Sequence, residues 1–236
     1  MSRKRKNEYA DTARQLKELN VPTNKETALY ADGILDKEEH IVPVRTFPIM
    51  FGVPMDEVMF SKFFTFFMRN IHPMPWDSFA STESTYLPDA RNTIHKIFYN
   101  SDKYSHIFML DSDVLCPQDT VERLLSHKKP VVAGWYRNKQ ATKPHHPIVY
   151  DFDSDDGETI QWTPREEEGV GLEQVGAVGA GCILMSHKVA LALGEEPYDM
   201  NSGGEDMKLC YKLRKLGIPI FVDWSLDCSH LGVDWK

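Results

Sequence analysis

Two aspartates, Asp111 and Asp113, stand two residues apart directly after the apolar run 106–110. A continuous apolar run of this kind is typical of a buried strand in a parallel sheet. The two carboxylates are therefore expected in a cleft at the carboxyl end of that strand. Such oxygen ligands suit Mg²⁺ or Mn²⁺, which can bridge to the phosphates of a ligand. The same pair could instead cap the next helix or stand in solvent, because two aspartates at this spacing are common.

A second pair of acids, Glu205 and Asp206, opens a predicted helix after Gly203 and Gly204. The glycines allow the backbone to approach a ligand closely, and the helix dipole favours acids in the first turn. The simplest interpretation is that these residues cap the helix. In a cleft, one of the carboxylates could instead remove the proton from a hydroxyl nucleophile.

Three further features carry weaker signals. Gly179 and Gly181 do not fit a dinucleotide-binding fingerprint, so they indicate either close approach to a bulky ligand or a β-bulge. His230 follows the last predicted strand and becomes functional only if it reaches a metal at Asp113. The segment Trp135-Tyr136-Arg137, which also follows a strand, could stack on a sugar or a base, or could simply cover the edge of the core.

The elements that must position these residues alternate between residues 46 and 134. Apolar strands are expected at 47–51, 74–80, 106–110 and 130–134, with amphipathic helices at 58–67, 88–99 and 117–125 between them. This alternation predicts a doubly wound, mainly parallel α/β sheet of Rossmann-like type, with ligands at the carboxyl ends of its strands.

After residue 134 the alternation stops. The turn residues 155–157 predict an antiparallel hairpin, and 175–185 reads as one extended segment, followed by a short helix to Leu193. An amphipathic helix should run from Glu205 to Leu216, with Leu216 facing inward and Gly217 ending it. A last strand is expected at 218–224.

The domain organisation follows from this pattern. Residues 1–45 are polar, with helical stretches at 9–19 and 25–35, and are expected to form an N-terminal extension. Residues 46–236 are expected to form the catalytic domain, with a nucleotide-binding half at 46–134 and an acceptor-binding half at 135–236.

Composition narrows the class of protein. The chain has 236 residues, of which 42% are hydrophobic and 26% charged, enough for a sizeable core. No apolar stretch is long enough for a membrane span and no apolar run follows the basic residues 3–6, so a cytoplasmic protein is expected. The four cysteines form no CxxC pair, which argues against a disulfide framework or a zinc knuckle.

The net charge of −8 has a local origin. Residues 151–173 contain nine acids and one base, which accounts for the whole excess. We expect this acidic insertion to be solvated. Net charge therefore does not exclude an anionic acceptor. Because residues 3–6 are basic, a nucleic-acid substrate remains one of the alternatives.

Taken in order, these segments resemble the GT-A fold of nucleotide-sugar glycosyltransferases, and most closely the large family 2. The resemblance covers residues 46–232 and rests on the order of its parts. Those parts are Ala90-Arg91-Asn92, the strand leading into Asp111-Ser112-Asp113, the glycine segment 175–185, Gly204-Glu205-Asp206 and His230-Leu231-Gly232.

The resemblance implies roles for individual residues. Asp113 would ligate Mn²⁺ or Mg²⁺, with Asp111 on the metal or the ribose and His230 as a further ligand. Asp206 would be the general base that deprotonates the acceptor hydroxyl, supported by Glu205. This role requires a transfer that inverts the configuration of the sugar, and inversion is the expected outcome. Residues expected to contact the nucleoside-diphosphate sugar, UDP-linked by default, are Asp111, Arg91, Asp89, Pro48, Gly179, Gly181 and Trp135. The acceptor hydroxyl could belong to a glycan, a small molecule, a protein or a modified DNA base.

Two other functions stay open. A sugar-nucleotidyl transferase would carry a glycine-rich basic loop after its first strand, whereas residues 50–54 read Met-Phe-Gly-Val-Pro. A catalytically idle nucleotide-sugar or carbohydrate-binding module should have lost Asp113, Asp206 or His230, and all three are present. A metal-dependent nuclease is disfavoured because no Glu-x-Lys pattern accompanies the paired acids.

Overall fold

The computed structural model describes residues 34–35, 41–42, 45–55, 61–71, 73–82, 86–139, 146–155, 160–200 and 204–231. The chain divides into two compact units, residues 1–47 and 48–236. In the first unit, β1 (Ile34–Leu35) pairs antiparallel with β2 (Ile41–Val42). The helix expected at 25–35 is wrong at this end, because these apolar, mostly β-branched residues pair as strands. The stretch 9–19 and the basic residues 3–6 lie outside the described residues.

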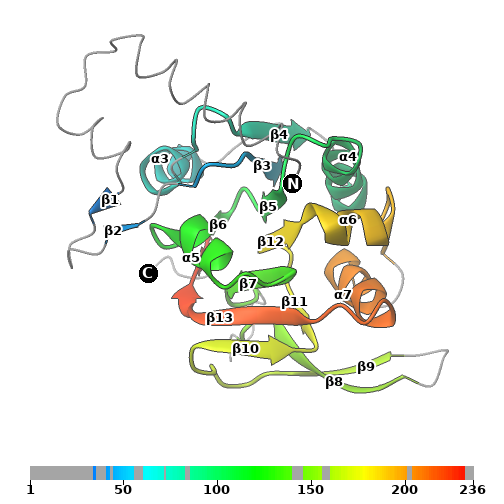
Figure 1. Ribbon diagram of the computed structural model, residues 1–236. Helices are drawn as coiled ribbons and strands as arrows, with labels where there is room; N and C mark the ends of the chain where they lie inside the picture. The colour runs from blue at the N-terminus through cyan, green and yellow to red at the C-terminus, as the bar shows by residue number, and fades with distance from the viewer. Residues whose placement is uncertain are drawn as a thin grey trace, which may run out of the picture. The chain divides into compact units, whose positions relative to one another are not determined.

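The second unit is built on a seven-stranded sheet with the order β10-β13-β7-β12-β5-β3-β4 (Figure 1). Its strands are β3 (Ile49–Pro54), β4 (Ser78–Thr82), β5 (His106–Leu110), β7 (Val131–Trp135), β10 (Leu172–Val175), β12 (Cys182–Ser186) and β13 (Ile220–Asp227). The expected α/β class is confirmed. The sheet is mixed, because β5, β3 and β4 are parallel and β7 is parallel to β13, whereas β12 and β10 run antiparallel to their neighbours.

Helices cover both faces of this sheet (Figure 1). The helices are α3 (Ser61–Asn70), α4 (Leu87–Tyr99), α5 (Thr120–Ser126), α6 (His187–Leu193) and α7 (Glu205–Lys215). α4, α6 and α7 lie on one face, and α3 and α5 on the other. Every residue of β3 and β7 is buried, as covered faces require. The helices expected at 88–99 and 117–125 are confirmed with shifted ends, and residues 58–60 lie outside the described residues.

Two smaller sheets complete the unit. β8 (Val149–Asp155) pairs antiparallel with β9 (Ile160–Pro164) and with β11 (Ala177–Val178). The expected hairpin is therefore confirmed, although its turn lies outside the described residues. β6 (Val114–Leu115) pairs antiparallel with β14 (Ser229–His230). The segment 175–185 is not one extended run, because its residues belong to β10, β11 and β12 in two different sheets.

The acidic insertion is paired as well as solvated. Arg165 lies 2.6 Å from a carboxylate oxygen of Asp151 and 2.7 Å from one of Glu173. Lys215 of α7 lies 2.8 Å from Asp155. These three acids are therefore ion-paired at the surface, by Arg165, which follows β9, and by Lys215 of α7.

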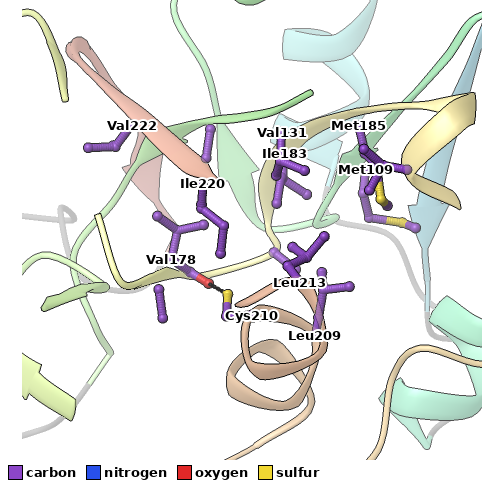
Figure 2. Close-up of a cluster of buried hydrophobic side chains, with 14 of the residues drawn as sticks. Met109, Val131, Val178, Ile183, Met185, Leu209, Cys210, Leu213, Ile220 and Val222 are labelled. Atoms are coloured by element: carbon purple, nitrogen blue, oxygen red, sulfur yellow. Dashed lines mark hydrogen bonds between the residues drawn. The ribbon is translucent and has the colours of Figure 1, made fainter. Parts of the chain in front are cut away.

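One cluster of core side chains lies between α7 and the sheet (Figure 2). Leu209 and Leu213 pack with Ile183 and Ile220 in a cluster of buried side chains, into which α7 also directs Cys210. Leu216 is 49% exposed, so its predicted inward orientation is wrong. The helix ends at Lys215, and Gly217 then turns the chain with a φ of +67°. No helix in the described ranges combines the length and apolar character needed to cross a membrane.

Candidate active site

One edge of the seven-stranded sheet collects most of the residues singled out by the sequence. Leu110, the last residue of β5, pairs with Cys182, the first residue of the antiparallel β12. Asp111 therefore emerges beside Gly181, and its backbone N–H donates to the Gly181 carbonyl oxygen at 3.0 Å. α4 begins after the carboxyl end of β4 at this same edge, which brings Arg91 to the site.

A buried arginine, Arg91, faces three carboxylates from two segments, the end of β5 and the first turn of α7. Its side chain is 1% exposed, and Nη2 lies 2.8 Å from Oδ1 of Asp111 and 3.9 Å from Oδ1 of Asp206. Nε lies 3.4 Å from Oε1 of Glu205, and Nη1 donates to the Ala180 carbonyl oxygen at 3.3 Å. Arg91 was expected to contact the nucleotide sugar, but its N–H groups are directed at these protein groups. One guanidinium faces three carboxylates, so the network has an excess of negative charge.

This excess changes the proton affinity of Asp206. Burial raises the pKa of Asp206 to about 7, with Arg91 opposing the shift and the charges of Glu205 and Asp111 adding to it. Its Oδ1 has no hydrogen-bond partner among the described residues. Burial likewise raises the pKa of Asp111. A carboxylate with a pKa near neutrality is suited to accept a proton from a substrate.

A second group forms around Asp113. The pairing of β6 with β14 brings the Nε2 atom of His230 to 3.6 Å from Oδ1 of Asp113. Lys139 Nζ contacts the other carboxylate oxygen of Asp113. Burial alone would raise the pKa of Asp113, but hydrogen bonds from His230 and Lys139 outweigh it and lower the pKa to about 2. Asp113 is therefore ionised at any physiological pH, in contrast to Asp206.

The Asp113 group fits a divalent cation. Nδ1 of His230 lies 2.8 Å from the Arg137 carbonyl oxygen, which can only accept a hydrogen bond. The hydrogen bond from His230 to Asp113 needs a proton on Nε2; once a metal takes the place of that proton, the remaining proton sits on Nδ1 and the Nε2 lone pair faces the Asp113 carboxylate. A carboxylate oxygen and an imidazole nitrogen whose lone pairs face each other can both bind one Mn²⁺ or Mg²⁺ ion. The Asp111 carboxylate, expected as a further ligand, is directed at Arg91 instead.

Tyr136, the middle residue of the segment considered for stacking on a sugar or a base, packs against other residues of the site. Its Oη accepts a hydrogen bond from the Gly181 N–H at 2.9 Å, and its ring lies edge-on to that of His230 at 5.1 Å. A Cβ on Gly181 would lie 2.6 Å from this Oη and from Oδ2 of Asp111, and one on Gly179 would lie 2.4 Å from it. The two glycines thus make room for Tyr136, whereas a ligand was expected. The alternation of side chains at a strand end is the signal that could have separated Tyr136 from Trp135.

Three expected donor contacts are not brought to this group. Trp135 is 1% exposed and belongs to the core, because its indole N–H donates to the Trp224 carbonyl oxygen at 2.9 Å. Pro48 precedes β3 at the opposite edge of the sheet, where its carbonyl oxygen accepts from the Ser105 N–H at 3.0 Å. Asp89 is exposed in the first turn of α4, and its side chain forms no ion pair with the described site residues. Gly203 lies outside the described residues.

Comparison with known proteins identifies the fold. No protein-family model and no curated protein matches the chain. The crystal structure of A197 from STIV matches with a TM-score of 0.57 and 16% identity over 78% of this chain and 85% of that one. The crystal structure of GalNAc-T7 with UDP, GalNAc and Mn²⁺ matches with a TM-score of 0.53 and 11% identity. The match covers 78% of this chain and 43% of that one, so the present chain spans less than half the length of that protein. The unit 48–236 accordingly has an α/β fold of the GT-A type.

Proposed function

We propose that this protein is a metal-dependent glycosyltransferase that moves a sugar from a nucleoside-diphosphate sugar to an acceptor hydroxyl with inversion. The observation that carries the proposal is that two aspartates at one edge of the sheet have pKa values shifted in opposite directions. Asp113, beside His230, has a lowered pKa and is ionised, whereas Asp206, beside Arg91, has a pKa raised to about 7. Environments that push the pKa values of neighbouring acids apart are typical of acid–base assignments in enzymes. The likeness in fold to GalNAc-T7 with UDP, GalNAc and Mn²⁺ supports UDP as the default nucleotide.

Asp113 and His230 would hold the Mn²⁺ or Mg²⁺. When bound there, the ion supplies a Lewis acid that stabilises the departing nucleoside diphosphate. Lys139 contacts the carboxylate oxygen of Asp113 that His230 does not approach. Its ammonium group adds positive charge where the donor diphosphate would lie.

Asp206 would act on the acceptor. Its carboxylate takes the proton of the acceptor hydroxyl while the acceptor oxygen forms a bond to the anomeric carbon. The bond between that carbon and the diphosphate oxygen breaks in the same step, so the configuration inverts. Glu205 raises the pKa of Asp206 through its charge and holds Arg91 in place through its Oε1 atom. The acceptor is a hydroxyl of a glycan, a small molecule, a protein or a modified DNA base.

The test is a panel of nucleotide sugars, with and without Mn²⁺, read out as release of nucleoside diphosphate. We expect release from one donor that depends on the metal and is lost in Asp113→Asn. Asp206→Asn should bind the donor with an unchanged Kd and lose transfer by about 10²- to 10⁴-fold, the usual contribution of a general base. Glu167→Gln, an exposed acid of the insertion, is the matched control and should behave as wild type.

Three results would overturn the proposal. Failure of every nucleotide sugar to bind in the presence of Mn²⁺ would remove the donor class. Release of pyrophosphate from a nucleoside triphosphate and a sugar phosphate would identify a sugar-nucleotidyl transferase. Donor binding without transfer or hydrolysis under any condition would identify a binding module.

A further inference from the structure

Three cysteines that are distant in the sequence meet in the interior of the second unit. The Sγ atoms of Cys116, Cys182 and Cys228 all lie within 4.8 Å of one another, and those of Cys116 and Cys182 are 3.4 Å apart. Each cysteine is at most 3% exposed, and all three thiols are free. The absence of a CxxC pair argued against a zinc knuckle, but this cluster draws its sulfurs from three separate segments.

Each of these segments also carries part of the candidate active site. Cys116 directly follows β6, whose pairing with β14 positions Asp113, and Cys228 directly precedes β14, which ends at His230. Cys182 opens β12 opposite the end of β5. The backbone N–H of Cys228 donates to the carbonyl oxygen at the end of β7 at 2.8 Å. The cluster therefore joins the strands that bring Asp113 and His230 together.

The surroundings leave room for the sulfurs. A Cβ on Gly134 would lie 3.0 Å from Sγ of Cys182 and 3.1 Å from Sγ of Cys228, so glycine keeps this side open. The carbonyl oxygen of Leu226 lies 3.6 Å from Sγ of Cys228 and supplies a fourth polar atom. Three buried sulfurs thus lie close together, and one of them has a backbone carbonyl oxygen beside it.

We propose that Cys116, Cys182 and Cys228 form a site for a thiophilic divalent cation of the Zn²⁺ class, separate from the Asp113 group. Zn–S bonds of about 2.3 Å in a tetrahedral site place the sulfurs about 3.8 Å apart, within the range of separations in this cluster. Binding releases the thiol protons and changes no oxidation state. The cation ties β6, β12 and the start of β14 together, and so holds Asp113 and His230 in register.

Cobalt titration tests this site directly. The full chain, reduced and stripped of metal with a chelator, is titrated with Co²⁺ and observed for thiolate-to-cobalt charge-transfer absorption. We expect a band that saturates at about one equivalent and disappears when Zn²⁺ displaces Co²⁺. Oxygen and imidazole ligands produce no such band, so the result is independent of whether the Asp113 group binds metal or the protein transfers sugar. A wild-type protein without the band overturns the proposal.

Variants assign the ligands. Cys116→Ser should lose the band, whereas Cys210→Ser should keep it, because Cys210 is buried elsewhere with its Sγ 3.5 Å from the Val178 carbonyl oxygen. Asp113→Asn should also keep the band. Loss in Cys210→Ser together with retention in Cys116→Ser contradicts the assignment. If Cys116→Ser does not fold, X-ray absorption at the cobalt edge of the wild type decides, since only oxygen and nitrogen neighbours would overturn the site.

Discussion

At the scale of single residues, the acids of the site differ in how many cationic or hydrogen-bonding side chains lie beside them. Among the residues that the structure describes, one cation, Arg91, faces Asp111, Glu205 and Asp206, whereas Asp113 has both Lys139 and His230. Burial, only partly opposed by Arg91, raises the pKa of Asp206 to about 7, whereas the hydrogen bonds of His230 and Lys139 outweigh the burial of Asp113 and lower its pKa to about 2. This difference leads to two predictions about individual side chains.

The first concerns pH. Because the base must be ionised, kcat/KM should rise with pH through about 7, the pKa of Asp206. Arg91→Met removes the charge that opposes this shift, so the rise should move to higher pH. The same change should lower the free energy of unfolding by roughly 3–5 kcal/mol, since it leaves buried carboxylates unpaired. Rate profiles and urea unfolding measure both effects, with Lys188→Met as an exposed control. A profile whose rise stays in place in Arg91→Met contradicts the assignment.

The second concerns Lys139, whose ammonium group is paired with one carboxylate oxygen of Asp113. Lys139→Met should bind Mn²⁺ about tenfold more tightly, a gain of about 1.4 kcal/mol, because no cation has to be displaced. Calorimetric titration with Mn²⁺ alone measures this, and Lys188→Met should leave the Kd unchanged. The donor KM should rise in Lys139→Met, because positive charge beside the diphosphate is lost. An unchanged Kd for Mn²⁺ would show that Lys139 does not compete for Asp113.

At the scale of elements, the antiparallel strand β12 builds the site. It enters between β5 and β7, so the residues before it, Ala180 and Gly181, lie among the residues that follow those two strands. The carbonyl oxygen of Ala180 binds Arg91, and the N–H of Gly181 binds Tyr136. Backbone groups of one short segment thus position both the arginine and the tyrosine.

Gly181→Ala tests this arrangement. The new Cβ would lie 2.6 Å from Tyr136 Oη and from Asp111 Oδ2, so both side chains must move. We expect a loss of about 10²-fold in kcat/KM with an intact fold by circular dichroism, as small displacements in active sites often cause. Gly181→Ala combined with Tyr136→Phe should recover part of the activity, because phenylalanine lacks the hydroxyl that clashes. Full activity in Gly181→Ala would mean that the close packing has no functional role.

Helix α7 links the core to the site, since it begins at Glu205 and buries Leu213. Leu213→Ala should lower the free energy of unfolding by about 2–5 kcal/mol through lost burial and a cavity. Leu216→Ala is the matched control on the same chain segment, and it should change stability by less than about 0.5 kcal/mol because Leu216 is 49% exposed. Denaturant unfolding measures both. Equal effects would contradict the described packing of α7.

At the scale of the whole molecule, stability and the proposed activity make opposite demands on Asp206. Folding raises the pKa of Asp206 from its ordinary 3.8 to about 7, so the folded state holds the proton longer than the unfolded state. The stabilising contribution is complete below pH 4 and is lost as pH rises through about 7. Above that range the buried carboxylate destabilises the fold.

Asp206→Asn should therefore melt at a higher temperature than wild type at pH 8, by several degrees, and show little difference near pH 4. Scanning calorimetry across this range measures the effect. Glu167→Gln, which changes an exposed acid, should track the wild type at both pH values. A variant that is less stable than wild type at pH 8 would contradict the direction of the shift.

Much of the fold could be predicted from sequence because local periodicity records which side of an element is buried. The apolar runs at 106–110 and 130–134 correspond to β5 and β7, and the stripe at Leu209 and Leu213 corresponds to the buried side of α7. The position of Asp111 after a strand and of Glu205 at a helix start follow from the same patterns. Short strands such as β6 and β14 were missed, because two residues are too few to show any period.

The sequence by itself therefore determined the α/β class and the local setting of each acid. Only the tertiary structure decided which acids share a cation, that Tyr136 and not Trp135 faces the site, and that Cys116, Cys182 and Cys228 meet. The physical reason is that burial and periodicity act over a few residues. Pairing between segments more than a hundred residues apart, as between β6 and β14, depends instead on the order and direction of strands in the completed sheets.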